Sequence, residues 1–318
     1  MKKVAVIIVN WNGKKFLGNC LKSVYEQSYD NFDLYFVDNG SIDDSVEFVK
    51  KNFPKACIIS LTENTGFALG NNIGIEKALE DSDVEYVVLL NNDTVTEKDW
   101  LQSLVKLVDY ENKVDMISSK SLFLDGKVQT IGLKFEKNLM GDSLGGLAIG
   151  FGQNDTDFNK VEEVFCPSGV SCLYSRRLLQ EVGFFDEDFF AYAEDLDLGM
   201  RARKKGYKCL FSPDSRLIHL HSQSSGGRAS KFKSFLIKRN IYFVAIKNFS
   251  TKDLLLFPFR DFAWNFKNIF SGNKNKSSYI LRKKVGIFGI FLTILHAYSS
   301  VIYYLPKMLK KRWILKSI

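Results

Sequence analysis

The sequence predicts an α/β domain built on a mixed, mainly parallel sheet with flanking helices, followed by a basic and aromatic helical region. Three observations support this fold class. Short apolar runs rich in β-branched residues alternate with helical patterns through the first 120 residues, as in a parallel sheet with crossover helices. Polar residues directly follow several of these runs, and the composition changes near residue 228.

The alternating segments define the elements in order. Strands are expected at 4–9, 33–37, 56–61, 86–90 and 114–118, and apolar residues at helical spacing predict helices at 14–27, 43–53, 67–80 and 97–108. Residues 121–165 lose this rhythm and contain turn clusters, which indicates hairpins and a mobile loop. Beyond them the pattern predicts a strand and then a helix within 162–183, a helix at 194–205 and a strand at 207–212.

Charge is divided unevenly along the chain. Residues 228–318 hold 19 Lys and Arg and 2 Asp and Glu, a net charge of +17, whereas residues 1–227 hold 25 basic and 34 acidic residues, a net charge of −9. Such an excess of positive charge points to an anionic partner.

The five cysteines are odd in number and scattered, with no CxxC or CxxH spacing. Neither a disulfide framework nor a structural zinc site is therefore indicated, and we expect reduced, mostly buried thiols in a cytoplasmic protein. The apolar run at 4–9 is too short for a secretory signal and is better explained as a first strand.

Polar residues gather at the ends of four predicted strands. One such terminus would be ordinary turn chemistry, but the carboxyl ends of neighbouring parallel strands share one edge of a sheet, where open α/β folds bind ligands. We therefore expect a crevice for a polar ligand there. Its residues would be Asn10-Trp11-Asn12, Asp38-Asn39-Gly40-Ser41, Asn64-Thr65-Gly66 and Asn91-Asn92-Asp93.

Six motifs in order resemble the family 2 glycosyltransferases, which are inverting enzymes of the GT-A fold, and within them the rhamnosyltransferase-like branch of bacterial surface-polysaccharide synthesis. The motifs are VAVIIVNWNG, VDNGSIDDS, NTGFALGNNIGI, LLNNDTV, GFFDEDFFAYAEDLDLGMRARKKGY and IHLHSQSSG. The resemblance covers residues 3 to 245. It implies a catalytic domain over 1–227, with a nucleotide-sugar half at about 1–120 and an acceptor half at about 121–227.

The resemblance also implies a nucleotide pocket. Asp38 resembles the carboxylate that accepts from the N3–H of uracil or thymine, although an Asp at this position also suits a simple turn. Gly66 would let the backbone approach the ribose, and Gly169 would lie under the donor sugar. The other expected pocket residues are Asn10, Asn12, Asn64, Asn71, Asn91 and Asn92.

A divalent cation, Mn²⁺ or Mg²⁺, is implied by the same family. Asp93 occupies the final position of its DxD motif, and Asn91 replaces the first Asp, which lowers the local negative charge. The family also places a metal-ligating histidine after the acidic helix. His219 is the preferred candidate and His221 the alternative.

Glycosyl transfer with inversion needs a base that accepts a proton from the acceptor hydroxyl. The family assigns this role to the second carboxylate of its ED pair, here Asp195, with Glu194 as runner-up. The alternative is that acidic residues in a first helical turn only complement the helix dipole. Asp197 is expected to point away from the site and to pair with Arg201 at i, i+4.

Phe190 and Tyr192 precede the acidic pair and would form an aromatic platform for an acceptor sugar; the alternative is that they belong to the core.

The implied activity is transfer of L-rhamnose from dTDP-rhamnose to a lipid-linked saccharide, with UDP-galactofuranose or another UDP-hexose as alternative donors. A degenerate transferase and a non-catalytic membrane or nucleic-acid binding protein are the competing hypotheses. Nucleic acid is not favoured, because the apolar runs of the tail are longer than base stacking requires.

The tail contains an apolar stretch at 285–305, flanked on both sides by basic residues and interrupted by His296 and two serines. Its 21 residues are long enough to span a bilayer core at ~1.5 Å per residue. Equal charge on both flanks gives no topological asymmetry. We therefore favour a helix or helical hairpin in the membrane interface over a spanning helix or a packed soluble helix, with lysines on lipid phosphates. The predicted location is peripheral, on the cytoplasmic face of the plasma membrane.

Overall fold

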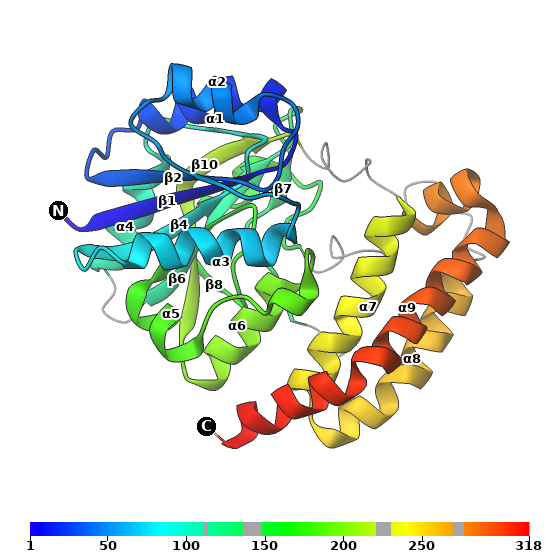
Figure 1. The fold of residues 1–318 in the computed structure, drawn as a ribbon. Helices are drawn as coiled ribbons and strands as arrows, with labels where there is room; N and C mark the ends of the chain where they lie inside the picture. The colour runs from blue at the N-terminus through cyan, green and yellow to red at the C-terminus, as the bar shows by residue number, and fades with distance from the viewer. Residues whose placement is uncertain (111–113, 136–147, 221–229, 270–276, 318) are drawn as a thin grey trace.

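The computed structural model describes residues 1–110, 114–135, 148–220, 230–269 and 277–317. Within them a single mixed sheet runs in the order β3-β2-β1-β4-β9-β6-β10-β5, with β7 paired to β6 and β8 paired to β10 (Figure 1). Parallel pairing joins β3, β2, β1 and β4, whereas β9 is antiparallel to both of its neighbours. The strands are β1 Lys3–Asn10, β2 Phe32–Asp38, β3 Cys57–Ser60, β4 Val84–Leu90, β5 Thr94–Thr96, β6 Val114–Leu122, β7 Val128–Thr130, β8 Glu162–Val164, β9 Ser171–Ser175 and β10 Lys208–His219.

Helices cover both faces of this sheet, which is why its central strands are apolar on both sides. On β1, Val4, Val6 and Ile8 join one buried cluster, and Ala5 and Ile7 join the other. The first cluster is closed by α1 Lys14–Tyr25, α2 Ser45–Asn52 and α4 Trp100–Tyr110; the second is closed by α3 Gly66–Leu79, α5 Arg176–Val182 and α6 Glu194–Lys204. The predicted α/β fold class is confirmed.

Two differences from the predicted elements matter for the site. Residues Thr94–Thr96 form a short strand, β5, that was not predicted. The predicted strand at 207–212 continues as β10 to His219, because the chain absorbs Pro213 in a bulge between Ser212 and Arg216 and then resumes pairing. His219 is therefore a strand residue paired with Thr94.

The C-terminal region forms a layer of three helices, α7 Lys231–Asn248, α8 Thr251–Ile269 and α9 Ser277–Ser317. Figure 1 shows α7 beside α6, with α9 and α8 farther out. Phe189, Leu196 and Met200 of the α/β domain share a buried cluster with α7 residues such as Phe243, and with Met308 of α9. Within the described residues one helical stretch, Ile280–Leu315, is long and apolar enough to cross a membrane; its helix is interrupted at Gly286, where φ is 71°.

The basic residues that follow the apolar stretch do not all face outward as predicted. The Lys307 ammonium lies 2.6 Å from an Asp188 carboxylate oxygen, and Lys311 bonds both Asp188, at 2.7 Å, and Asp186. Arg312 is 8 % exposed and donates to the carbonyl of Ile246. Lys307 and Lys311 pair with acidic residues on the adjacent surface of the α/β domain. Their predicted contact with lipid phosphates stays a prediction.

Candidate functional site

The amides at the ends of β1 and β4 are joined in one buried network. Asn10 donates to Asp38 Oδ1 at 3.1 Å and to Ser41 Oγ at 3.1 Å, and its own Oδ1 accepts from Asn92 at 2.7 Å. Asp38, 2 % exposed, also accepts from the Ser41 N–H through Oδ2. Gly13 is required beside this network, since a Cβ there would lie 2.2 Å from Asn92 Nδ2 and 2.4 Å from Asn10 Oδ1.

A second network ties the end of β2 to the turn before α3, and its central residue is Asn39, which was expected in the crevice but not among the nucleotide-pocket residues. Asn39 donates to the Gly66 carbonyl at 2.9 Å and to Asn64 Oδ1 at 3.2 Å, and accepts from both the N–H and the hydroxyl of Thr65. Asn64 also accepts from the Gly66 N–H at 2.9 Å. The signal for Asn39 was its place at this polar strand end, directly after Asp38.

Asn12 and Asn71 lie nearby but are engaged in local bonds. Asn12, at φ 50°, accepts from the Ile42 N–H through its side chain. Asn71 donates to the Phe67 carbonyl one turn back in α3. Their part in nucleotide binding stays a prediction.

Asp93 and His219 meet at the junction of β5 and β10. The His219 Nε2 atom lies 3.0 Å from Asp93 Oδ1, and both side chains are 6 % exposed. Asn91 Nδ2 lies 3.4 Å from the same nitrogen, and Gln129 Oε1 lies 2.8 Å from Nδ1. Because the amide oxygen of Gln129 only accepts, its bond to Nδ1 places the proton there and directs Nε2 toward Asp93, as the hydrogen-bond partners of metal-bound histidines do.

This donor set fits a hard or borderline divalent cation, for which carboxylate oxygen and imidazole nitrogen are suitable ligands. Among the described residues no group of three or more His, Cys, Asp or Glu side chains is positioned to hold a metal. A cation bound by Asp93 and His219 would therefore complete its coordination with oxygens from substrate or water, as Mg²⁺ sites do. His221, the alternative ligand, lies outside the described residues.

The acidic pair opens α6 and is linked to the strand ends through residues 169 and 170. Asp195 Oδ2 accepts from the Gly169 N–H at 3.0 Å, and the Val170 carbonyl accepts from the Asn91 N–H at 3.0 Å. Adjacent residues of one segment thus hold Asp195 on one side and the end of β4 on the other. Gly169 contacts the base candidate directly, and its predicted place under the donor sugar stays a prediction.

Glu194 and Asp195 differ in their surroundings. Burial raises the pKa of Glu194 well above its usual range, and the neighbouring Asp195 charge adds to this; Glu194 Oε2 has no hydrogen-bond partner among the residues that the structure describes. Burial also raises the pKa of Asp195, although hydrogen bonds from the Gly169 and Leu196 N–H groups oppose the shift. Asp195 is half-buried and Glu194 5 % exposed, so Asp195 is the better placed of the two to exchange a proton with a ligand.

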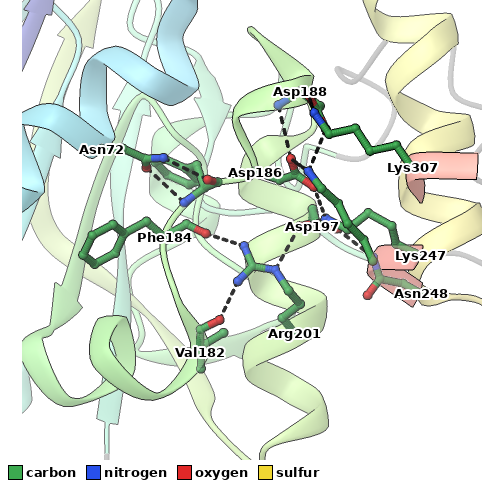
Figure 2. A network of polar contacts seen from close by, with 12 residues as sticks. Asn72, Val182, Phe184, Asp186, Asp188, Asp197, Arg201, Lys247, Asn248 and Lys307 are labelled. Carbon is green, nitrogen blue, oxygen red and sulfur yellow. Dashed lines mark hydrogen bonds and ion pairs between the residues drawn. The ribbon is translucent and has the colours of Figure 1, made fainter. Parts of the chain in front are cut away.

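Asp197 faces α7 and lies in a buried network of charges with Arg201 and Lys247 (Figure 2). It is fully buried and bonds Arg201 Nε at 2.9 Å, Lys247 Nζ at 2.8 Å and Asn248 Nδ2 at 2.8 Å. Burial alone would raise the pKa of the Asp197 carboxyl, but the Lys247 and Arg201 charges outweigh it and hold that pKa well below its usual range. The predicted Asp197–Arg201 pair is confirmed, and Lys247 is a partner that sequence reasoning missed.

Phe190 and Tyr192 lie between the turn before α3 and the start of α7. The Phe190 carbonyl accepts from the Ala68 N–H at 3.0 Å, and its ring packs edge-on to Phe232 at 5.9 Å. The Tyr192 ring lies under Lys233 Nζ at 5.2 Å. Gly66, at φ +87°, has no room for a Cβ, which would lie 2.5 Å from the Phe190 carbonyl oxygen.

Comparison with solved structures identifies the class of fold. The chain is similar to S. aureus TarS 1-349 in complex with UDP-GlcNAc, with a TM-score of 0.57 and 16 % identity over 96 % of this chain and 92 % of the other. It is also similar to the mannosyltransferase PcManGT from Pyrobaculum calidifontis in complex with GDP-Man and Mn2+, with a TM-score of 0.55 and 16 % identity over 95 % and 87 %. The fold is the GT-A fold.

The family follows from the sequence match. A family model described as glycosyl transferase family 2 matches residues 5–183, and the chain belongs to this family. Among curated proteins, the chain is 23 % identical to poly-beta-1,6-N-acetyl-D-glucosamine synthase of Staphylococcus aureus (strain COL) over 71 % of this chain and 52 % of the relative. It is 26 % identical to the uncharacterized protein y4gI of Sinorhizobium fredii over 82 % of this chain and 28 % of the relative. The chain thus spans about half, or less, of the length of these curated relatives.

Proposed function

We propose that this chain is an inverting glycosyltransferase that moves a sugar from a nucleoside diphosphate sugar to a saccharide acceptor. The observation that carries the proposal is the link through residues 169 and 170, which holds Asp195 and the end of β4 to the same edge of the sheet. A base candidate and a cation-binding pair at one edge are what displacement of a diphosphate requires.

The chemistry follows from these positions. The acceptor oxygen forms a bond to the anomeric carbon as the bond from that carbon to the diphosphate oxygen breaks, and the acceptor proton passes to Asp195. The raised pKa of Asp195 makes it a stronger base than an exposed aspartate. Asp93 and His219 would hold Mn²⁺ or Mg²⁺, which supplies positive charge to the departing diphosphate.

The first candidate donor is dTDP-L-rhamnose, which the motif resemblance favours, and the acceptor would be a lipid-linked saccharide of a bacterial surface polysaccharide. A UDP-linked donor is the second candidate, because a relative in fold binds UDP-GlcNAc and a relative in sequence is named as an N-acetylglucosamine polymer synthase. UDP-galactofuranose belongs to this second group.

The test uses the purified full chain with Mn²⁺ and a panel of dTDP-rhamnose, UDP-galactofuranose, UDP-GlcNAc and UDP-glucose. Release of the nucleoside diphosphate is measured with and without acceptor. We expect turnover of one donor and a loss of about 10²-fold or more in Asp195→Asn, since a general base contributes ~10²–10⁴-fold. Asp125→Asn, an exposed acid in the turn after β6, is the matched control. Turnover that survives Asp195→Asn would remove Asp195 as the base.

We further propose that α8 and α9 hold the enzyme on an anionic membrane surface without spanning it. Large apolar side chains on both helices are exposed, among them Phe259 at 76 %, Phe262 at 70 %, Phe288 at 72 % and Trp313 at 71 %. The other face of α9 is buried: Val301 and Met308 belong to the cluster shared with α7, and Ala297 is fully buried. A helix with one face packed on its own domain and one exposed apolar face suits the interface plane better than a bilayer span.

Flotation with vesicles tests this placement. Wild-type protein should float with vesicles that contain phosphatidylglycerol and less with phosphatidylcholine alone, because lysine charges add to the apolar contact. Phe259→Ser combined with Phe288→Ser should reduce flotation. Leu124→Ser, at an equally exposed apolar residue (73 %) in the turn after β6, should not. Extraction of the wild type only by detergent, and not by salt or carbonate, would instead favour a spanning helix.

A further inference from the structure

The segment that leads into the acidic pair has an unfavourable backbone conformation. Phe190, Tyr192 and Ala193 have φ values of 63°, 73° and 69°, a region that residues with a Cβ rarely adopt. Such conformations persist only where the surroundings hold them. They lie directly before Glu194 and Asp195, so whatever holds this segment also sets the position of the base candidate.

Asn240, from the middle of α7, holds the segment. Its side-chain nitrogen lies 2.9 Å from the Phe189 carbonyl oxygen, 2.8 Å from that of Ala191 and 2.7 Å from that of Tyr192. Asn240 is fully buried, and a single amide group with two protons is thus directed at three carbonyls. The remaining carbonyl of this stretch, that of Phe190, points the other way and accepts from Ala68 of α3.

Arg239, the residue before Asn240, fixes the amide in this orientation. Its Nε donates to Asn240 Oδ1 at 2.9 Å, and Nη2 donates to the carbonyls of Asp188 and Phe189 at 3.0 and 2.9 Å. The Asn240 oxygen is thereby occupied, so its NH₂ group must face residues 189–193, the segment that leads into the acidic pair.

We propose that Asn240 is a positioning residue for the transfer reaction, which acts on Asp195 through the backbone of residues 189–193. This inference rests on the proposed function. Residues that hold a catalytic group matter because a displacement of about 1 Å costs on the order of 10²-fold in rate. Within the described residues the hydrogen bonds of Asn240 go to Arg239 and to the backbone of residues 189–192. Its effect should therefore fall on the rate of transfer and not on donor binding.

The test compares Asn240→Ala and the milder Asn240→Ser with Asn265→Ala. Asn265 is a matched control because it is also a buried asparagine of the C-terminal helices, bonded to Lys238 and Tyr298 and not to residues 189–193. We expect Asn240→Ala to lower kcat by about 10- to 100-fold while KM for the donor changes less than about threefold. Asn240→Ser, which keeps one donor, should lie between this variant and the wild type, and Asn265→Ala should keep kcat.

Hydrogen exchange of the amides in residues 189–196 provides a readout that does not depend on turnover. Exchange there should be faster in Asn240→Ala than in the wild type and unchanged in Asn265→Ala. Unchanged exchange, or faster exchange with kcat within twofold of the wild type, would overturn the inference. If the wild type turns over no donor, the proposed function fails, and exchange still decides whether Asn240 holds this segment. If Asn240→Ala does not fold, Asn240→Ser carries both measurements.

Discussion

Replacing Asp197 by Asn should destabilise the protein strongly although it removes no catalytic group. The carboxylate is fully buried and bonds two cations and an amide at 2.8 to 2.9 Å. Breaking a buried ion pair by removing one partner costs about 3–5 kcal/mol, because the remaining charge is left uncompensated. In the variant, Lys247 still pairs with Asp186, and Arg201 still donates to the carbonyls of Val182 and Phe184. We therefore expect a loss at the lower end of this range, about 3 kcal/mol.

The assay is urea unfolding followed by circular dichroism, with thermal unfolding beside it. A loss of that size is a large part of a typical total stability of about 5–15 kcal/mol, and at about 2–4 °C per kcal/mol it lowers Tm by roughly 6–12 °C. The matched control is Glu85→Gln, which removes an exposed ion pair to Lys2 at 3.0 Å. Its unfolding free energy should stay within about 0.5 kcal/mol of the wild type.

The pH dependence of the difference in unfolding free energy between wild type and Asp197→Asn shows whether the charge of Asp197 is the cause of the loss. Asp197 has a native pKa below the value of about 3.9 expected in the unfolded chain. Its contribution is therefore complete above about pH 4 and is lost as the pH falls through the lower native pKa. The difference between wild type and Asp197→Asn should be constant from pH 5 to 8 and shrink below pH 4. A loss under about 1 kcal/mol at pH 7, or a difference that does not shrink in acid, would refute the role assigned to this network.

Three shorter predictions concern the site. If Asp195 is the base, the acid limb of kcat/KM should lie above about pH 4, because burial raises its pKa and the base must be unprotonated; a limb at or below pH 4 would contradict this. Gln129→Leu should weaken Mn²⁺ binding about 10- to 100-fold by calorimetry, since it removes the bond that orients His219; unchanged affinity would contradict this orienting role of Gln129. Gly66→Ala should lower the unfolding free energy by about 1–3 kcal/mol through its positive φ and the approach of Phe190, and an unchanged urea midpoint would contradict this.

The part of the site that follows from strand order was predictable. Asn10, Asp38 and Asn92 come from three strands, and their bonds in one network follow from the rule that parallel strands end at one edge. Gln129 was not predictable in this way, because it lies where the sequence loses its periodicity and its partner His219 is 90 residues away. Only pairing of β7 with β6, and of β6 with β10, brings the two together.

Lys247 of α7 was not predicted as a partner of Asp197, for a different reason. A composition of lysines and aromatics identifies a helix as basic and apolar, but not which side chains turn inward. Lys247 is 3 % exposed and lies between Asp186 and Asp197, although the sequence gives it the same appearance as the lysines that were predicted to face lipid. Pairing inside a protein depends on the surface that the helix covers, which local sequence does not describe.

The positive charges of residues 228–318 therefore pair with acidic residues of the α/β domain, in addition to their proposed binding to an anionic membrane. Lys247, Lys307 and Lys311 bond Asp186, Asp188 and Asp197, the acids on either side of the strained segment that Asn240 holds. Part of the excess of +17 in the tail thus compensates part of the −9 of the preceding residues within one molecule. Since these bonds flank Asp195, the helices proposed to lie on the membrane also support the position of the proposed base. Binding of the acceptor's membrane and placement of the catalytic acid would then depend on one set of helices.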